Sequence, residues 1–143
     1  YITESKISHY IKEGLRDPKI LMIPIILNIK LSKDDNHANI LILNKNTNII
    51  ELFEPHGSRT SGSTLGGDIG AYTKKIRYLR KYLLKHIPEF TLLNTVDEIK
   101  QSAFQTTNDP DKHSGYCVTW SMLYAHYRIL NPSIPYYYNI TYP

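Results

Sequence analysis

The residue with the most reactive side chain in this sequence is Cys117, the only cysteine among 143 residues. It lies where a polar loop, residues 108–115, gives way to a run without glycine or proline that ends at Asn131-Pro132. We therefore expect Cys117 at or near a helix N-terminus, where unpaired N–H groups and the helix dipole favour thiolate over thiol. The alternative is that Cys117 is simply a small buried hydrophobic residue.

A nucleophilic cysteine needs a base, a group that orients the base, and donors for the oxyanion. His37 and Glu54 stand at the open ends of two strand-like runs, residues 37–44 and 48–54, which polar turn residues join. If the turn centres between Lys45 and Asn46, His37 lies directly opposite Glu54. The pattern thus predicts an imidazole and a carboxylate in contact at strand ends, which favours a catalytic cysteine over a structural one.

Other histidines compete for the role of base. His56 follows Glu54 closely, and His113 precedes Cys117 closely. The remaining three lie in predicted helices, where we expect them to be surface or packing residues: His9, His86 and His126.

Hydrophobic patterns predict the elements that must position these side chains. The apolar run over residues 19–31 is predicted to be a buried strand. It contains Pro24, which indicates a bulge or an edge position. The hairpin that carries His37 and Glu54 is apolar on both faces and should be buried on both sides. The predicted helices are 4–15, 71–87 and a run that starts at Cys117, and the predicted strands are 19–31, 37–44, 48–54 and 90–95, with the tail 134–140 as a final strand or edge. Together they predict one α+β domain over residues 1–143, with a central mixed sheet flanked by helices.

Composition sets the broad class. A hydrophobic content of 41% and a charged content of 21% fit a globular domain, and the net charge is +4. A single cysteine excludes an internal disulfide, which suits a reducing compartment. The longest apolar run, residues 20–29, is too short to span a bilayer. No signal-peptide pattern is present, and because the chain starts at Tyr1 we expect it to be a piece of a longer protein.

Two further segments have no catalytic motif. The glycine-rich residues 57–70 lack the Gly-Lys-Ser/Thr ending of a phosphate loop and are expected to form a mobile surface loop. The helix over 71–87 carries six basic residues around an apolar stripe that includes its tyrosines, and we interpret the basic side chains as solvated rather than as a nucleic-acid site. No metal or cofactor is expected.

The order His, acid, Gln, Cys resembles the ubiquitin-like-protein proteases, a clan that includes the SUMO proteases and the adenovirus and poxvirus processing proteases. Residues 37–43, 51–57 and 115–121 look most like divergent members from large DNA viruses, and the similarity covers residues 37–57 and 104–132. The resemblance implies a papain-like fold of the SUMO-protease/adenain type. It also implies roles for four residues: Cys117 as nucleophile, His37 as general base, Glu54 as its orienter and Gln105 as the side-chain oxyanion donor.

The implied activity is cleavage of peptide or isopeptide bonds, in ubiquitin-like protein tails or at Gly-Gly and Gly-X sites of a viral polyprotein. The implied setting is intracellular: host cytoplasm, viral factory or virion. The partner would be a protein substrate, with neither membrane nor nucleic acid expected, and the oligomeric state is left open. The alternatives are an acetyltransferase effector with a His–Glu–Cys triad, which would need acetyl-CoA and inositol polyphosphate, and a non-catalytic module that binds a ubiquitin-like protein.

The sequence departs from the family pattern at four places. Ala38 follows the histidine where the SUMO proteases commonly have Trp, and Val118 follows the cysteine where they usually have Gly. The acid is Glu54 rather than the commoner Asp. Gln105 precedes Cys117 by 12 residues, which makes residues 106–114 an insertion. These differences leave the triad chemistry in place and weaken the inference about substrate.

Overall fold

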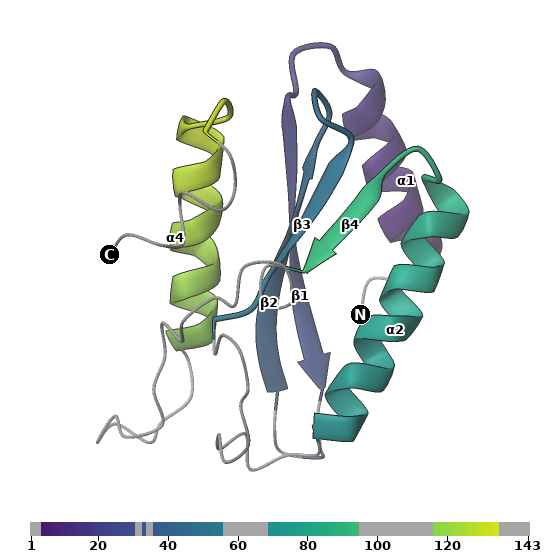
Figure 1. Cartoon of the computed structure of the whole chain (residues 1–143), viewed down its shortest axis with the longest axis vertical. Coiled ribbons are helices and arrows are strands. Elements are labelled where there is room, and N and C mark those ends of the chain that lie inside the picture. Colours follow the sequence, from purple (N-terminus) through teal and green to yellow (C-terminus); the bar gives the residue numbers. More distant parts are fainter. Residues whose placement is uncertain (1–3, 31–32, 34–35, 56–68, 95–115, 135–143) are drawn as a thin grey trace.

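The computed structural model describes residues 4–30, 33, 36–55, 69–94 and 116–134 (Figure 1). Along the chain the elements are α1 (Glu4–Arg16), β1 (Met22–Lys30), β2 (Asn36–Asn44), β3 (Ile49–Phe53), α2 (Ile69–His86), β4 (Thr91–Asn94) and α4 (Tyr116–Leu130). The α+β class is confirmed, and each predicted helix and strand within the described residues is present. The predicted tail strand lies outside them beyond Ile134.

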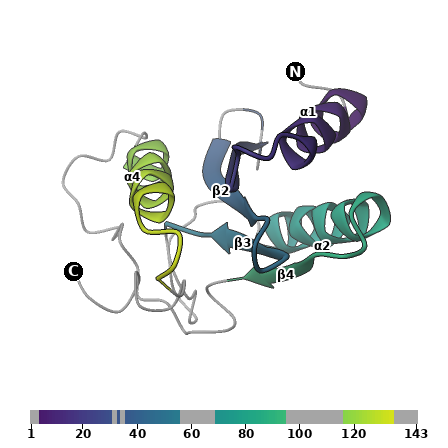
Figure 2. The ribbon, with the colours of Figure 1, turned by 90° about the horizontal axis from the view of Figure 1, so that it is seen from above.

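The strands form one four-stranded sheet in the order β1-β2-β3-β4. β1 pairs with β2 and β2 with β3 in antiparallel fashion, whereas β3 pairs with β4 in parallel. A parallel pair needs a crossover connection, and α2 lies within the connection between β3 and β4. Figure 2 shows α1 and α2 on one face of the sheet and α4 on the other. The predicted mixed sheet with flanking helices is therefore confirmed.

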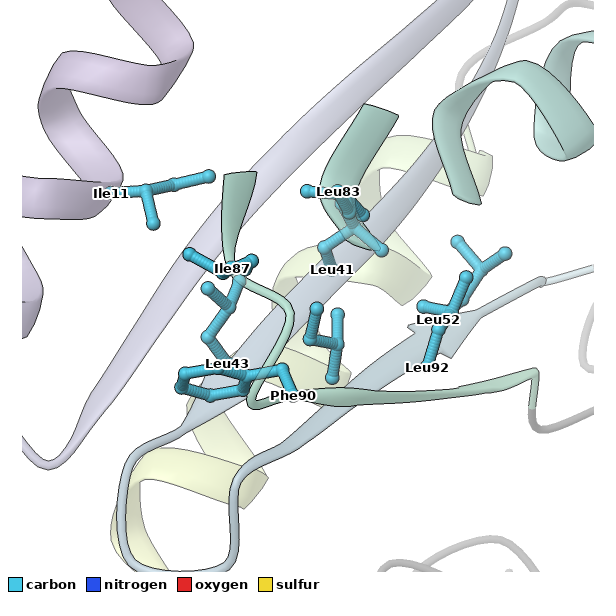
Figure 3. Close-up of a cluster of buried hydrophobic side chains, with 9 residues drawn as sticks. Ile11, Leu41, Leu43, Leu52, Leu83, Ile87, Phe90 and Leu92 are labelled. Carbon is cyan, nitrogen blue, oxygen red and sulfur yellow. The ribbon is translucent and has the colours of Figure 1, made fainter. Parts of the chain in front are cut away.

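The hairpin of β2 and β3 is buried on both faces, as predicted, because helices cover both sides of it. Successive side chains of a strand point to opposite faces. Leu41 and Leu43 accordingly join the cluster under α1 and α2, while Ile40 and Ile42 join the cluster under α4. Figure 3 shows the first cluster, in which Ile11 of α1 and Leu83 of α2 meet the sheet.

β1 is less buried than predicted. Its side chains alternate between partly buried and exposed, and Ile26 is 48% exposed. The reason is position, since β1 is an edge strand.

The Lys45 N–H donates to the Leu21 carbonyl at 3.0 Å, so odd-numbered residues of β1 direct their backbone groups toward β2. The missing N–H of Pro24 thus falls on the side away from β2, where no ladder bond is lost. The edge position is confirmed, and the one-for-one register through Pro24 excludes a bulge.

The register of the β2–β3 hairpin differs from the prediction. Asn44 pairs with Ile49, and the turn ends at Asn48, which has a φ of 53° in the left-handed region that asparagine tolerates. The predicted turn was centred one residue too early, which shifts the pairing by two residues. An even shift keeps every side chain on its own face, so the burial prediction was correct although the register was wrong.

α2 shows the predicted apolar stripe, with Ile76, Leu79, Leu83 and Ile87 contributing to the core next to it. The interpretation that its tyrosines all lie on this stripe is wrong, because Tyr78 is 60% exposed on the opposite side. The basic side chains of α2 are exposed, as expected: Lys74, Lys75, Arg77, Arg80, Lys81 and Lys85. α2 begins at Ile69, so the predicted loop 57–70 is two residues too long, and its remainder lies outside the described residues. No helix in the described ranges is long and apolar enough to cross a membrane.

A buried ion pair that the sequence did not predict joins α4 to the sheet. Arg128 donates to both oxygens of Glu51, from Nε to Oε2 at 2.7 Å and from Nη2 to Oε1 at 2.6 Å. The Tyr124 hydroxyl donates to Glu51 Oε2 at 2.9 Å. Arg128 Nη1 also donates to the carbonyls of Asn131 and Ile134, so the residues after α4 are tied to the same guanidinium. Both charges are hydrogen-bonded, which offsets the cost of burying them.

We expect Arg128→Met to lower the free energy of unfolding by about 3–5 kcal/mol, because it leaves the Glu51 carboxylate buried without its cation. Urea denaturation measures this directly. The double variant Glu51→Leu/Arg128→Met should recover most of the loss, since it removes both charges. The matched control is Arg16→Met, whose partner Glu13 is exposed and whose loss should cost at most about 1 kcal/mol. Equal losses for Arg128→Met and Arg16→Met would contradict a stabilising role for the buried pair.

Candidate active site

Three of the four predicted site residues lie at one end of the sheet. His37 is the second residue of β2, Glu54 directly follows β3, and Cys117 is the second residue of α4 (Figure 1). The imidazole and the carboxylate are both buried, at 2% exposure, and Cys117 is partly buried. The site thus has a buried acid–base pair beside a thiol that solvent still reaches.

His37 and Glu54 are in direct contact, with Nε2 and Oε1 2.6 Å apart. The contact was predicted, but the directly opposite pairing behind the prediction is wrong. The ladder ends with Ile40 opposite Phe53, and its continuation places Asn39, not His37, opposite Glu54. His37 reaches Glu54 along the diagonal, a separation that long side chains span.

His37 and Cys117 each change the acidity of the other. Burial lowers the pKa of His37, but the hydrogen bonds and negative charges of Cys117 and Glu54 outweigh it and raise the pKa to about 9. The hydrogen bond from His37 lowers the pKa of the Cys117 thiol against the opposing effect of burial, and backbone hydrogen bonds at Ala38 and Val118 add to the lowering. Both directions favour a thiolate–imidazolium pair.

The helix face explains why Cys117 points to this site. The buried residues of α4 are Ser121, Tyr124, Ala125 and Arg128, which repeat at the spacing of one helix face. Cys117 precedes Ser121 by four residues and therefore lies on the same face, one turn nearer the N-terminus. At the level of this turn, the Ser121 hydroxyl donates to the Ala38 carbonyl at 3.5 Å, next to His37.

Sequence reasoning missed two neighbours of the pair. Tyr72, in the second turn of α2, packs against His37 with ring centroids 6.0 Å apart and an interplanar angle of 67°. Asn39 donates from Nδ2 to Glu54 Oε2 at 2.9 Å and lies 3.1 Å from the Tyr72 hydroxyl. The spacing of Asn39 from His37 was an available signal, because residues two apart in a strand share a face.

The remaining candidates are not all placed. Gln105 lies outside the described residues, and so do His56 and His113, so the role of Gln105 as oxyanion donor stays a prediction. His9, His86 and His126 are exposed on their helices, as predicted. In the described part of the chain, no three His, Cys, Asp or Glu side chains are grouped in a way that could hold a metal ion.

We expect Cys117 to react with iodoacetamide at pH 6–7 faster than the same residue in the His37→Ala variant, because His37 lowers the pKa of the thiol and so raises the fraction of thiolate. As the pH rises toward the ordinary thiol pKa, the two rates should converge. Since Cys117 is the only cysteine, the intact mass of the protein reports its modification without ambiguity. Identical pH profiles for the two folded proteins would show that Cys117 is not activated.

Comparison with known proteins gives no guide to function: no family model matches the chain, and no match was found among curated proteins or solved structures. Function must therefore be inferred from the geometry of these side chains.

Proposed function

We propose that this protein is a thiol-dependent peptidase that cleaves peptide or isopeptide bonds. The observation that carries the proposal is the position of His37, which contacts the Glu54 carboxylate and lowers the pKa of the Cys117 thiol. A nucleophile, a base and a group that orients the base are the parts that acyl transfer requires.

Each residue has a defined part in the proposed reaction. His37 holds the proton of Cys117, and the thiolate attacks the substrate carbonyl carbon. The oxyanion forms near the N-terminus of α4, where the backbone N–H of Cys117 and the Gln105 side chain are the proposed donors. His37 then protonates the leaving amine, and water hydrolyses the thioester. Glu54 stabilises the imidazolium and fixes the plane of the ring.

The accessibility of Cys117 supports a reactive rather than a structural role. Buried structural cysteines are inert, whereas catalytic ones lie in partly exposed surroundings that lower their pKa. Cys117 is only partly buried, and its neighbours Tyr116 and Val118 are exposed. A substrate carbonyl therefore has a route to the sulfur.

The finer parts of the proposal rest on the sequence resemblance. They are a papain-like arrangement of the SUMO-protease/adenain type and substrates that are ubiquitin-like protein tails or viral polyprotein sites. A cysteine on a helix that packs against a hairpin carrying the histidine and the acid is consistent with that arrangement. An intracellular setting belongs to the same proposal, because the nucleophile must stay reduced.

Cys117→Ala should abolish hydrolysis of fluorogenic peptides ending in Gly-Gly, and His37→Ala should nearly do so. Glu54→Gln should retain more activity than His37→Ala, because an amide still orients the ring but no longer stabilises the imidazolium. His126→Ala, on the exposed face of the same helix, is the matched control and should match the parent protein.

A second measurement separates the alternatives. Vinyl-sulfone probes built on different ubiquitin-like proteins should form adducts at Cys117, detected by mass spectrometry. Incubation with acetyl-CoA should leave Cys117 unmodified. A stable acetyl thioester would favour the acetyltransferase, and failure of peptides, probes and acetyl-CoA alike would reject catalysis in favour of a binding module.

Gln105→Ala should lower kcat by about 10²–10³-fold with little change in KM, the effect of losing one oxyanion donor. Gln101→Ala is the natural control, because these two are the only glutamines in the chain and Gln101 follows a polar stretch. Exchange of the two phenotypes would move the assignment to Gln101, and two silent variants would mean that backbone groups alone form the oxyanion hole.

A further inference from the structure

Asn39 is fully buried beside the proposed catalytic pair. It lies on β2 two residues from His37, with no exposed surface. Its Nδ2 atom has three oxygens within hydrogen-bonding distance: Glu54 Oε2 at 2.9 Å, the Phe53 carbonyl at 3.2 Å and the Tyr72 hydroxyl at 3.1 Å.

The orientation of the Asn39 amide is determined by these neighbours. A flipped amide would turn Oδ1 toward the Glu54 carboxylate and the Phe53 carbonyl, two groups that only accept hydrogen bonds. The observed orientation instead leaves Oδ1 buried with no hydrogen-bond partner in the part of the chain that the structure describes. An unsatisfied buried oxygen costs about 1–3 kcal/mol. The presence of an asparagine at this position despite that cost points to a role other than stability.

That role follows from how the oxygens of Glu54 are used. Oε1 contacts His37 and Oε2 accepts from Asn39, so the plane of the carboxylate is fixed between two partners. Without the Asn39 donor Oε2 loses one of its hydrogen bonds, and the carboxylate is held less firmly with Oε1 toward the imidazole. A donor to the charged form also favours ionisation of Glu54, which the imidazolium needs as its counter-charge.

We propose that Asn39 is a positioning residue of the active site, which holds the Glu54 carboxylate oriented and ionised toward His37 and links it to Tyr72 on α2. The inference rests on the proposed peptidase function, and it extends the three-residue site to a second layer built from β2 and α2. Among the described residues, the titratable groups that face this layer are His37 from β2, Glu54 after β3, Tyr72 from α2 and Cys117 from α4.

The test uses two substitutions at Asn39 and a matched control. Asn39→Leu has a similar size but no donor, and it also removes the unsatisfied oxygen, so the fold should be retained. Asn39→Asp places a second carboxylate against Glu54, so a donor exists only when the two carboxylates share a proton. Asn28→Leu, at an exposed position of the edge strand β1, is the control.

For Asn39→Leu we expect kcat/KM to fall about 10- to 100-fold, the range known for hydrogen-bond partners that orient the ligands of metal sites, with KM little changed. Alkylation of Cys117 by iodoacetamide at pH 6–7 should slow as well. Glu54 then stabilises the imidazolium of His37 less well, and the thiolate loses part of its stabilising positive charge. For Asn39→Asp both rates should be low at pH 8 and recover relative to Asn39→Leu as the pH falls. Asn28→Leu should behave as the parent protein in every assay.

The alkylation measurement does not depend on the peptidase assignment, so two kinds of failure are distinguishable. If the parent protein cleaves no substrate but the alkylation profiles shift as described, the positioning role of Asn39 stands and the proposed function fails. If the parent protein is active and folded Asn39→Leu keeps its profile, the positioning role is overturned and the function stands. Should Asn39→Leu not fold, the pH dependence of Asn39→Asp decides: a profile parallel to that of the parent protein overturns the proposal.

Discussion

The constraint on which the site depends is the position of α4 along the sheet, and the buried carboxylate of Glu51 determines it. Arg128 and Tyr124 both donate to Glu51 from one face of the helix. Sliding α4 by one turn would move it about 5.4 Å and break both contacts while leaving a charge buried. Apolar contacts alone tolerate such a shift far better, because they have no direction.

These contacts with Glu51 lie at the opposite end of α4 from Cys117. Arg128 lies in the last turn and Cys117 in the first, so the helix transmits the position of one to the other. Between them, the Tyr124 ring stacks on Phe53 with centroids 4.2 Å apart. Phe53 directly precedes Glu54, so the same packing that holds the middle of α4 also fixes the end of the strand that carries the acid.

The sequence was sufficient to predict the helices and strands and the grouping of His37, Glu54 and Cys117. It was not sufficient to predict the register of the two strands that bring His37 and Glu54 together. The turn contains two asparagines, Asn46 and Asn48, and local preference does not say which of them takes the left-handed conformation. The structure places it at Asn48. The prediction of the contact succeeded because the error in register was even and therefore conserved the faces. Tyr78, in contrast, was wrongly assigned to the apolar stripe of α2. Helical periodicity alone places it on a different side of the helix from Leu83.

Contacts outside the predicted site between distant segments were beyond the reach of the sequence. Glu51 is one acid within an apolar strand, and nothing local indicates that its cation is Arg128, 77 residues away. The same holds for Asn39 and Tyr72, which lie 33 residues apart. Pro24 indicated the edge position of β1, but the apolar composition of the strand did not show that its side chains would be only half-buried, because edge and central strands can have equally apolar sequences.

The long separation between β2 and α4 has a consequence for how the protein is made. Ser121 and Ala38, which join the two elements beside the site, are 83 residues apart. During synthesis the histidine, its acid and most of the sheet emerge well before the helix that carries the thiol. The pKa of the Cys117 thiol is lowered mainly by His37 on another element, so this lowering is absent until α4 docks. In a nascent or partly unfolded chain the thiol therefore keeps its ordinary acidity, and the docking of α4 is the step that changes it.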